Sequence, residues 1–429
     1  MRRDKLLFVS RAAREFGGVV LFRMGPKRRL YLLSHPLAVR RVLQENPRNY
    51  VKGIGLEQAR PALGEGILTS EGDLWAGQRE NLNKAFQHDK LAEYADAMAA
   101  AVDAMLGRWR AAARGGAPVD VAAEAVAMTL DVLGRSLFGV DLNGIGPRLT
   151  DALDEVVHWS IRRMTALAPL PLGVPTPGNL RCRRALRELD GLVDEVVRRR
   201  REAPASGGAL LSSLLGMRDE AGDPAARRLL RSEIVTLLLA GHETTATTLA
   251  WASHLLAADP ATQQRLRAEA SAVLGERLPT LPDLQRLPFT RMVVEETLRL
   301  YPPVWMITRR AIADDLIGGY AVPAGSDILI SVHTLHRHPD FWDAPEEFRP
   351  ERFAAERSRA RPSHSYLPFS TGPRSCVGSG FAMLEATLAL AMIVRAFRLS
   401  AAPGPPVEPE PLLTLRPRNG LRLILEPAG

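Results

Sequence analysis

Eight stretches of this chain carry apolar residues at helical spacing, and this repeated pattern is the strongest constraint on its fold. In each stretch the apolar side chains recur at intervals of three and four residues, as in a helix that buries one face. The pattern predicts a mainly α protein, with helices over residues 91–107, 121–137, 149–165, 181–202, 231–258, 260–274, 289–300 and 380–397.

Short strands are expected beside these helices. Residues 19–22 and 30–33 are predicted to form a hairpin, residues 321–322 and 327–330 flank a Pro-Ala-Gly turn, and residues 412–424 are expected to supply a C-terminal hairpin. The chain is 46% hydrophobic, and no linker, low-complexity tract or fixed-period repeat divides it. We therefore expect one continuous domain over residues 1–429.

The first residues do not resemble a targeting signal. The apolar run from Leu6 to Val9 is too short for a signal-peptide core, and far shorter than the roughly 20 residues that span a bilayer. Later apolar stretches carry charges within a helical turn or two. The sequence therefore predicts a cytoplasmic protein without a membrane anchor.

The net charge of +8 raises the question of a nucleic-acid partner. Most basic residues are arginines that alternate with acidic residues, and the one dense run, Arg198 to Arg201, ends a predicted helix, where cations are favoured. A solvated basic face is preferred over a nucleic-acid patch, and such a face would also attract an acidic protein.

Two cysteines are too few for a disulfide framework. Cys182 lies among arginines on an expected basic helix surface, and no special role is expected for it. Cys376 lies in the sequence PFSTGPRSCVG at residues 368–378, where flanking glycines let the backbone turn tightly and approach a flat ligand. The apolar helix that follows has free N-terminal amides, which favour a thiolate over a thiol.

Other residues of this loop suit a metal-bound ligand. Arg374 is placed to pair with a carboxylate on the ligand, and Phe369 to keep water away from a metal–sulfur bond. An isolated Cys-x-Gly would be an ordinary buried turn. The complete pattern Phe-x-x-Gly-x-Arg-x-Cys-x-Gly, which ends at Gly378, indicates instead a loop that binds haem iron through the thiolate of Cys376.

This loop resembles that of the cytochrome P450 family, and the family's other signatures follow in the expected order across nearly the entire chain. The resemblance implies the P450 fold, which is mainly α with small β-sheets. In that fold the helices form a triangular prism, and haem b lies between the long central helix and the helix that follows the cysteine ligand.

The sequence AGHETT at residues 240–245 lies inside the predicted helix 231–258, although glycine and threonine are poor helix formers. A kink or groove there would make room for a small ligand and waters. By resemblance, Thr244 would hydrogen-bond dioxygen and Glu243 would feed protons inward through water, since splitting the O–O bond requires two protons. His242 is expected to be structural.

The resemblance also implies a buried network of Glu296, Arg299 and Arg352 that fixes the core behind the cysteine loop. Glu296 and Arg299 are neighbours on one helix face, and Arg352 lies in the later sequence FRPERF at residues 348–353. By itself the Glu–Arg pair would be an ordinary solvent-exposed ion pair.

Haem propionates need cations. Trp75 and Arg79 lie one helical turn apart and resemble the family's Trp-x-x-x-Arg propionate clamp. Arg309 has the family's spacing for a second propionate arginine, with the adjacent Arg310 as the competing candidate, and Arg374 is the third. The alternative is that Arg79 is one more surface arginine of a basic protein.

The positions that the resemblance assigns to the substrate pocket are predominantly apolar: Ile67, Leu68, Leu238, Ala240, Val304, Met306, Ile307 and Leu413. They favour a small hydrophobic substrate such as a terpenoid, fatty-acyl or polyketide skeleton. The segment 166–178, rich in proline and glycine, either covers a substrate entrance or simply connects two helices.

Together these features imply a soluble, bacterial-type haem-thiolate monooxygenase that hydroxylates or epoxidises its substrate. We expect no attached flavin or nicotinamide domain, so electrons from NAD(P)H are expected through a separate ferredoxin or flavodoxin with its reductase. The alternatives are a peroxide-driven or desaturating relative and a non-catalytic haem protein that senses a gas or recruits a partner. Glu243 and Thr244 favour dioxygen chemistry, because a peroxygenase or a silent binder needs no proton relay.

Overall fold

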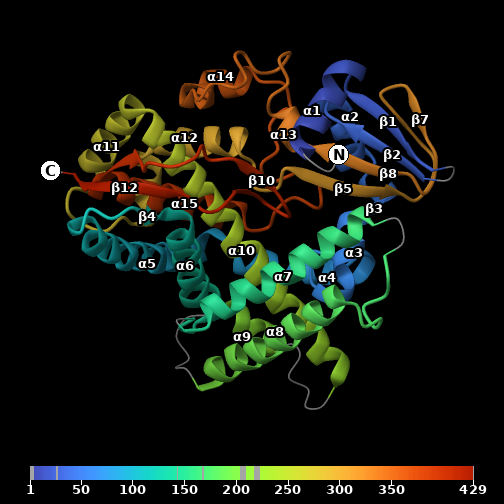
Figure 1. Cartoon of the computed structure of the whole chain (residues 1–429), viewed down its shortest axis with the longest axis horizontal. Helices are drawn as coiled ribbons and strands as arrows, with labels where there is room; N and C mark the ends of the chain where they lie inside the picture. Colours follow the sequence, from blue (N-terminus) through green and yellow to red (C-terminus); the bar gives the residue numbers. More distant parts are fainter. Residues whose placement is uncertain are drawn as a thin grey trace. The chain divides into compact units, whose positions relative to one another are not determined.

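The computed structural model describes residues 4–25, 28–142, 144–166, 169–202, 209–216 and 223–428, and most of them are helical (Figure 1). Internal contacts divide the chain into two compact units. Unit 1 contains residues 1–58, 295–376 and 410–416, and unit 2 contains residues 59–294, 377–409 and 417–429. Each unit therefore combines segments that are far apart in the sequence.

A mixed five-stranded sheet in the order β1–β2–β8–β5–β3 is the framework of unit 1. Its strands are β1 (Val19–Met24), β2 (Arg28–Leu33), β3 (Tyr50–Lys52), β5 (Met306–Ala311) and β8 (Asp327–Ser331). β2 and β8 run parallel, and the other neighbours are antiparallel. The central strand β8 is almost entirely buried, so the core of unit 1 forms around it.

Short elements surround this sheet. The strand β6 (Asp315–Ile317) pairs with β7 (Tyr320–Val322), and β10 (Pro409–Pro411) pairs with β11 (Leu415–Pro417). The helices are α1 (Lys5–Phe16), α2 (Pro36–Arg40), α13 (Val332–Leu335) and α14 (Ala355–Ala360), with the short 3-10 helix η5 (Pro350–Phe353). Two further helices, α3 (Ile54–Leu63) and α12 (Pro288–Leu300), each contain residues of both units.

Unit 2 holds the long helices. They are α4 (Gly72–Ala85), α5 (His88–Arg114), α6 (Val121–Leu133), α7 (Gly146–Thr165), α8 (Pro177–Glu202), α9 (Ala209–Gly216), α10 (Pro224–Ala258), α11 (Pro260–Leu274) and α15 (Ser379–Ala396). A small sheet joins β4 (Val119–Asp120), β12 (Arg422–Pro427) and β9 (Phe397–Ala401). α10 packs against α6 and α15, and α7 lies beside α8 (Figure 1).

The starts of α10 and α11 show how local sequence sets these helices. Each begins with an Asp-Pro pair, in which the proline has no N–H to satisfy. The carboxylate of Asp223 accepts the N–H of Ala225, and that of Asp259 accepts the N–H of Thr262. Both are therefore capped at their N-termini by a side chain.

All eight helices predicted from the periodicity are present, and so is the first hairpin. The predicted helix 121–137 ends as α6 at Leu133 and continues as the π-helix η3 (Gly134–Phe138). The predicted pairing at the C-terminus was wrong: β11 pairs with β10, whereas β12 pairs with β4 and β9. The two strands that flank the Pro-Ala-Gly turn are present as β7 and β8, and they pair with other strands, β7 with β6 and β8 with β2 and β5.

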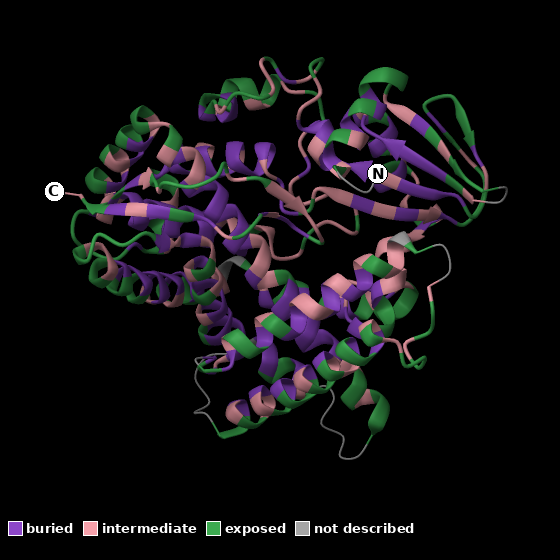
Figure 2. Cartoon of the chain, viewed as in Figure 1, coloured by how far each residue is buried: buried purple, intermediate pink, exposed green. Residues whose placement is uncertain are grey.

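α15 is a core helix. In the described part of the chain it is the one helix long and apolar enough to cross a membrane, but 67% of it is buried inside the structure. The outer faces of helices such as α5 and α8 are exposed instead (Figure 2). α15 therefore has the apolar surface expected of a helix packed among other helices.

Candidate functional site

Backbone contacts within unit 1 fix the loop that carries Cys376. The N–H of Cys376 donates to the carbonyl of Phe369 at 2.9 Å, and the N–H of Ser375 donates to the carbonyl of Gly372 at 3.1 Å. Gly372 has a φ of 73°, and a Cβ there would lie 1.9 Å from the carbonyl oxygen of Leu43. This position of the loop therefore requires glycine.

The backbone does not demand glycine at Gly378 in the same way. Gly378 immediately precedes α15 with a φ of −90°, a conformation open to any residue. That the backbone at Gly378 approaches a flat ligand closely stays a prediction. Arg374 and Phe369 are both half-buried in the same loop as the cysteine, so the structure keeps these three predicted residues together.

The two cysteines have opposite environments, and neither forms a disulfide. Cys376 is exposed, whereas Cys182 is buried in α8. The expectation that Cys182 lies on a basic helix surface was wrong, because its side chain is on the inner face of that helix. Burial raises the pKa of Cys182 to about 11, so this thiol stays protonated and unreactive.

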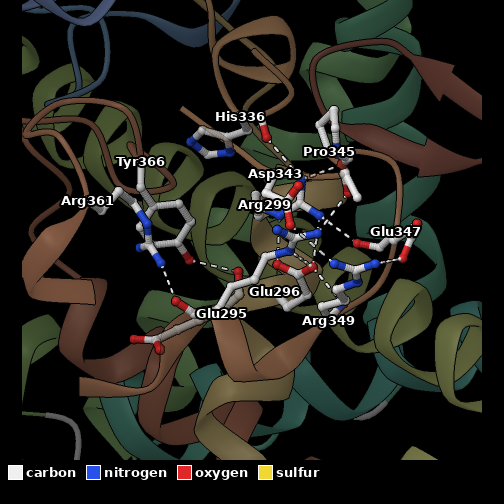
Figure 3. A network of polar contacts seen from close by, with 12 residues as sticks. Glu295, Glu296, Arg299, His336, Asp343, Pro345, Glu347, Arg349, Arg361 and Tyr366 are labelled. Carbon is white, nitrogen blue, oxygen red and sulfur yellow. Dashed lines mark hydrogen bonds and ion pairs between the residues drawn. The ribbon is translucent and has the colours of Figure 1, made fainter. Parts of the chain in front are cut away.

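The predicted network of Glu296, Arg299 and Arg352 is confirmed and lies wholly in unit 1. Figure 3 shows Glu296 and Arg299 side by side. Arg299 donates to both carboxylate oxygens of Glu296, at 2.7 and 2.8 Å, and both side chains are fully buried. Arg352 forms an ion pair with the same carboxylate at 3.3 Å. The backbone N–H of Arg349 adds a further hydrogen bond to it at 2.8 Å. Glu296 is therefore fully engaged by cations and N–H donors.

Arg299 also binds the backbone of the segment that leads to the cysteine loop. Its guanidinium donates to the carbonyls of His336, Pro345 and Glu347 (Figure 3). It also lies over the ring of Trp342. A single buried arginine thus fixes three separate points of the backbone, as only a planar guanidinium with five N–H groups can.

His336 connects this network to the cysteine loop. Its Nε2 accepts the backbone N–H of Leu367 at 2.7 Å, while its own carbonyl accepts a hydrogen bond from Arg299. The backbone turn that leads to Cys376 begins at Leu367, because the carbonyl of Leu367 accepts the N–H of Ser370. Burial, assisted by the charges of Arg299 and Arg337, lowers the pKa of His336 to about 3, so the imidazole is neutral.

In unit 2, the residues 240–245 lie in the middle of α10. Ala240 is exposed and Glu243 and Thr244 are half-exposed, although the helix is buried on either side of them. The hydroxyl of Thr244 donates to the carbonyl of Ala240 at 2.8 Å. α10 runs without interruption through this turn, so the structure has an accessible turn within a continuous helix.

His242 behaves as a structural residue. It is buried, and its Nδ1 makes a hydrogen bond with the carbonyl of Leu238 one turn earlier. Burial lowers the pKa of His242, so its imidazole is neutral. Its side chain is therefore on the packed face of α10, as expected.

The candidate propionate residues lie in different parts of the chain. Trp75 and Arg79 are half-buried and one turn apart on α4 of unit 2. In unit 1, Arg309 and Arg310 are adjacent on β5 and therefore point to opposite faces of the sheet. Arg310 is engaged by the carboxylates of Asp327 and Glu57. Arg309 is buried and donates to the carbonyl of Thr308, which leaves Arg309 as the better candidate.

The segments expected around the substrate pocket pack together within each unit. In unit 2, the backbone N–H of Ile67 donates to Glu233 of α10 at 3.3 Å. A Cβ at Gly66 would lie 2.2 Å from the hydroxyl of Thr236, so this segment lies directly against α10. In unit 1, the indole of Trp305 donates to the carbonyl of Leu412. Of the predicted loop 166–178, residues 167 and 168 lie outside the described residues.

Two buried polar residues were missed by the sequence reasoning. His336 belongs to no sequence motif, so only the structure identifies it as a buried polar residue. Glu385 interrupts the otherwise apolar sequence of α15, and a lone acid in such a helix was a signal that could have been noticed. Both are fully buried, so both must be neutral or paired.

Comparison with known proteins places the chain in a family. A family model described as Cytochrome P450 matches residues 2–424. Cyclooctatin synthase from Streptomyces melanosporofaciens is 37% identical over 434 residues, which cover 100% of this chain and 92% of that protein. Cyclooctat-9-en-7-ol 5-monooxygenase from the same organism is 38% identical over 391 residues, covering 90% and 84%. Pentalenene oxygenase from Streptomyces avermitilis is 34% identical over 427 residues, covering 99% and 93%.

A mainly helical fold with small sheets, and a cysteine loop directly before a long apolar helix, are the features of a haem-thiolate protein, and the chain belongs to the cytochrome P450 family. It is a monooxygenase that uses haem b and receives electrons from NAD(P)H through redox partners. Its substrate is a hydrophobic organic molecule.

The residues of the cysteine loop fit haem b. Cys376 is an exposed cysteine on a loop that backbone hydrogen bonds fix. Within the described ranges, no three His, Cys, Asp or Glu side chains cluster as a metal site would require. One thiolate and a porphyrin therefore suit this donor set better than a metal held by protein side chains alone.

Proposed function

We propose that Cys376 ligates the haem iron and that this chain oxidises a terpenoid skeleton by inserting one oxygen atom from dioxygen. The cysteine loop is the observation that carries the proposal, because its rigid backbone holds an exposed cysteine at the start of an apolar helix. The amides at this helix start favour the thiolate. When bound, the haem supplies the iron centre at which dioxygen is activated.

By the family resemblance, further residues of the chain would hold the cofactor. Trp75, Arg79, Arg309 and Arg374 supply one indole N–H and three guanidinium groups for the two propionates. Phe369 would keep water from the sulfur, and Gly378 would let the backbone approach the porphyrin. The engagement of Arg310 by two carboxylates supports Arg309 over Arg310.

Thr244 and Glu243 are proposed to handle protons. Thr244 is on the accessible side of α10, and its hydroxyl donates to the carbonyl of Ala240 in the same helix at 2.8 Å. It is therefore able to turn and donate to dioxygen. Glu243, half-exposed one residue earlier, is placed to collect protons from water and pass them inward.

The substrate class rests on the apolar pocket positions and on the relatives. Two of them carry terpenoid names, as cyclooctat-9-en-7-ol 5-monooxygenase and pentalenene oxygenase. The predicted pocket positions bear no charge that would anchor an acid or amine. Hydroxylation or epoxidation of a cyclic terpenoid in secondary metabolism is therefore the proposed activity.

We further propose a cytoplasmic enzyme without a membrane anchor that is reduced by a ferredoxin or flavodoxin with its reductase. The burial of α15 supports the absence of an anchor, because the apolar surface of that helix is already covered. The positive net charge supports an acidic electron carrier.

Spectroscopy and product analysis test the proposal together. The reduced, carbon-monoxide-bound protein is expected to show the red-shifted Soret band of a thiolate ligand, and Cys376→Ser is expected to lose it while Cys182→Ser keeps it. Cyclic terpenes should displace water from the iron and shift its spin state, and turnover under labelled dioxygen should place one labelled atom in the product. An unlabelled product, or a thiolate band in Cys376→Ser, would contradict the proposal.

A matched pair of threonines tests the proton relay. We expect Thr244→Ala to lower the yield of product per NAD(P)H consumed, and Glu243→Gln to slow turnover, each by about 10²-fold, the lower range for loss of acid–base assistance. Thr248→Ala is the control, because Thr248 lies one turn further along α10 and donates to the carbonyl of Thr244. Equal yields from Thr244→Ala and Thr248→Ala would remove the special role of Thr244.

A further inference from the structure

Two arginines of α10, one helical turn apart, bind the neighbouring helix α8 within unit 2. Arg231 donates from Nε to the carboxylate of Asp190 at 2.8 Å, and Arg227 donates to that of Asp194 at 3.0 and 3.1 Å. The two pairs differ in burial, because the side chain of Arg231 is 19% exposed and that of Arg227 is 76% exposed. Arg231 therefore lies largely beneath the surface, whereas Arg227 lies on it.

Arg231 also binds the end of α3. Its Nη1 donates to the carbonyls of Ala62, at 3.0 Å, and Leu63, at 3.4 Å, which are the last two residues of that helix. The last carbonyls of a helix have no partner within it and form the negative end of its dipole, so a guanidinium suits them. In the described residues, the guanidinium of Arg227 hydrogen-bonds to Asp194 alone. Arg231 therefore joins three helices, α3, α8 and α10.

The segment that follows α3 lies against the next residues of α10. Gly64 follows the last residue of α3 with a φ of 79°, and a Cβ there would lie 2.1 Å from the hydroxyl oxygen of Ser232. The backbone N–H of Ile67 donates to Glu233 at 3.3 Å. Ser232 and Glu233 directly follow Arg231 in the sequence. The segment with the predicted pocket residue Ile67 is therefore docked on α10 at three consecutive residues.

We propose that Arg231 is a positioning residue that couples the segment after α3 to the helix α8. The carboxylate of Asp190 holds the guanidinium through Nε, and because this group is planar, its Nη1 is then directed at the carbonyls of Ala62 and Leu63. Loss of the Asp190 contact frees Arg231 to turn away from them. A displacement of α8 is thereby transmitted to a wall of the predicted pocket. The inference rests on the proposed function for the place of that pocket.

Hydrogen exchange of the haem-loaded enzyme tests the coupling without a substrate, because amide exchange reports local opening. Asp190→Ala, a change on α8, is expected to speed exchange in residues 64–70 about threefold, the effect of one lost ion pair. Asp194→Ala is the matched control on the same helix and should leave this exchange unchanged. Equal exchange rates in the two variants would overturn the proposal.

Changes to the arginines measure the full contact. Arg231→Met keeps much of the side chain's length and removes every donor, so exchange in residues 64–70 should be about tenfold faster. Arg227→Met is its control and should match the wild type. If Asp190 acts through Arg231, the double variant Asp190→Ala/Arg231→Met should exchange no faster than Arg231→Met. Additive effects, about thirtyfold in total, would show that Asp190 supports the segment by another route and would sink the inference.

Turnover measurements connect the coupling to the pocket. With a cyclic terpene, Asp190→Ala should raise KM about threefold and leave kcat and the product formed per NAD(P)H unchanged, because Thr244 and Glu243 are untouched. Asp194→Ala should keep the wild-type KM. Faster exchange with an unchanged KM would refute the link to the pocket.

The two proposals fail in different ways. If no cyclic terpene shifts the spin state, or if the thiolate band survives in Cys376→Ser, the proposed function fails. The exchange rates of Asp190→Ala and Asp194→Ala still decide the coupling in that case, because they need no substrate. Equal rates, with the thiolate band and the spin shift present, would remove the role of Arg231 alone.

Discussion

Glu296 and Arg299 form a buried ion pair, and such a pair is sensitive to the loss of either member. Arg299 binds one carboxylate and three backbone carbonyls. We expect Arg299→Ala to destabilise the protein by roughly 3–5 kcal/mol, because it leaves a buried carboxylate with too few partners. The purified variant should be poor in haem or misfolded, as measured by haem content and urea unfolding.

Arg349 supplies the control. Its side chain is half-exposed and pairs with Asp343 and Glu347, while its contact with Glu296 uses the backbone N–H, which alanine retains. Arg349→Ala is therefore expected to cost at most about 1 kcal/mol, as for other exposed ion pairs. A normal haem yield from Arg299→Ala would contradict the role assigned to the network.

His336 gives a prediction for the pH dependence of stability. Its pKa is about 3 in the folded protein and 6.5 ordinarily, so below pH 6.5 the unfolded chain takes up a proton that the folded chain refuses. The contribution of the neutral His336 to the free energy of unfolding is complete above pH 6.5. It is lost as the pH falls from 6.5 towards 3, by at most about 1.4 kcal/mol per pH unit. We expect His336→Gln to show a flatter loss of unfolding free energy between pH 6.5 and pH 4.5.

That variant should nevertheless be less stable than the wild type at pH 7.5, by about 1–3 kcal/mol, since the N–H of Leu367 loses a well-placed acceptor. Parallel curves for the two proteins across the acidic range would show that His336 does not titrate as described.

Among single residues, those that belong to motifs were predicted from the sequence, and their neighbours in the structure were not. Cys376, Glu296 and Arg299 belong to patterns with fixed spacing, so they were found. His336 acts through burial and through a partner that is distant in sequence, which no local pattern encodes, whereas Glu385 left a local signal, an acid within an apolar helix. The accessible turn of α10 could not be predicted either, because exposure depends on which helices pack around it.

Among the elements, the long helices were predictable because each buries an apolar stripe and several carry a side-chain cap. α11 was predicted with its observed bounds, since an Asp-Pro pair begins it and Gly275 follows its last residue. α1 was missed, being short and largely exposed on one side, and α3 contains Pro61, which normally ends a helix. Strand pairing was less predictable, because β8 and β12 pair with strands that lie far away in the sequence, β8 with β2 and β12 with β4.

Three glycines inside exposed helix faces give a prediction at this scale. Gly77, Gly107 and Gly191 lie within α4, α5 and α8, and a Cβ at each would meet nothing within 4 Å. Replacing each with alanine should stabilise the protein by about 0.5–1 kcal/mol, because alanine loses less backbone entropy on folding. The gains should add, since the sites are on different helices.

Gly372→Ala is the opposite case. Its positive φ and the close carbonyl of Leu43 leave no room for a methyl group, so this variant should lose stability and haem. Urea unfolding of the triple-alanine variant and of Gly372→Ala measures the change in unfolding free energy in each. A triple variant no more stable than the wild type would show that the helical glycines serve another purpose.

For the whole molecule, the positive net charge predicts how electrons arrive. Reduction by an acidic ferredoxin should slow several-fold as ionic strength rises from about 0.05 to 0.5 M, because salt screens the attraction that brings the proteins together. Reduction by a small uncharged mediator is the control and should change little. Equal salt dependence for both reductants would argue against an acidic partner.

The division into two units was beyond the reach of sequence patterns, because each unit is assembled from separate pieces of the chain. That the chain forms one continuous domain over residues 1–429 stays a prediction. The mainly helical class, by contrast, followed directly from periodicity, since that depends only on neighbouring residues.

The parallel pairing of β2 with β8 has a consequence for how the protein is made. Leu30 meets Asp327, so the ribosome must release most of the polypeptide before the second strand acquires its inner neighbour. Until then the first hairpin has an open edge with apolar residues beside it, which is a template for association with other nascent chains. Fragments that stop before Asp327 should therefore aggregate during expression, and slow translation would prolong the same exposure in the full-length protein.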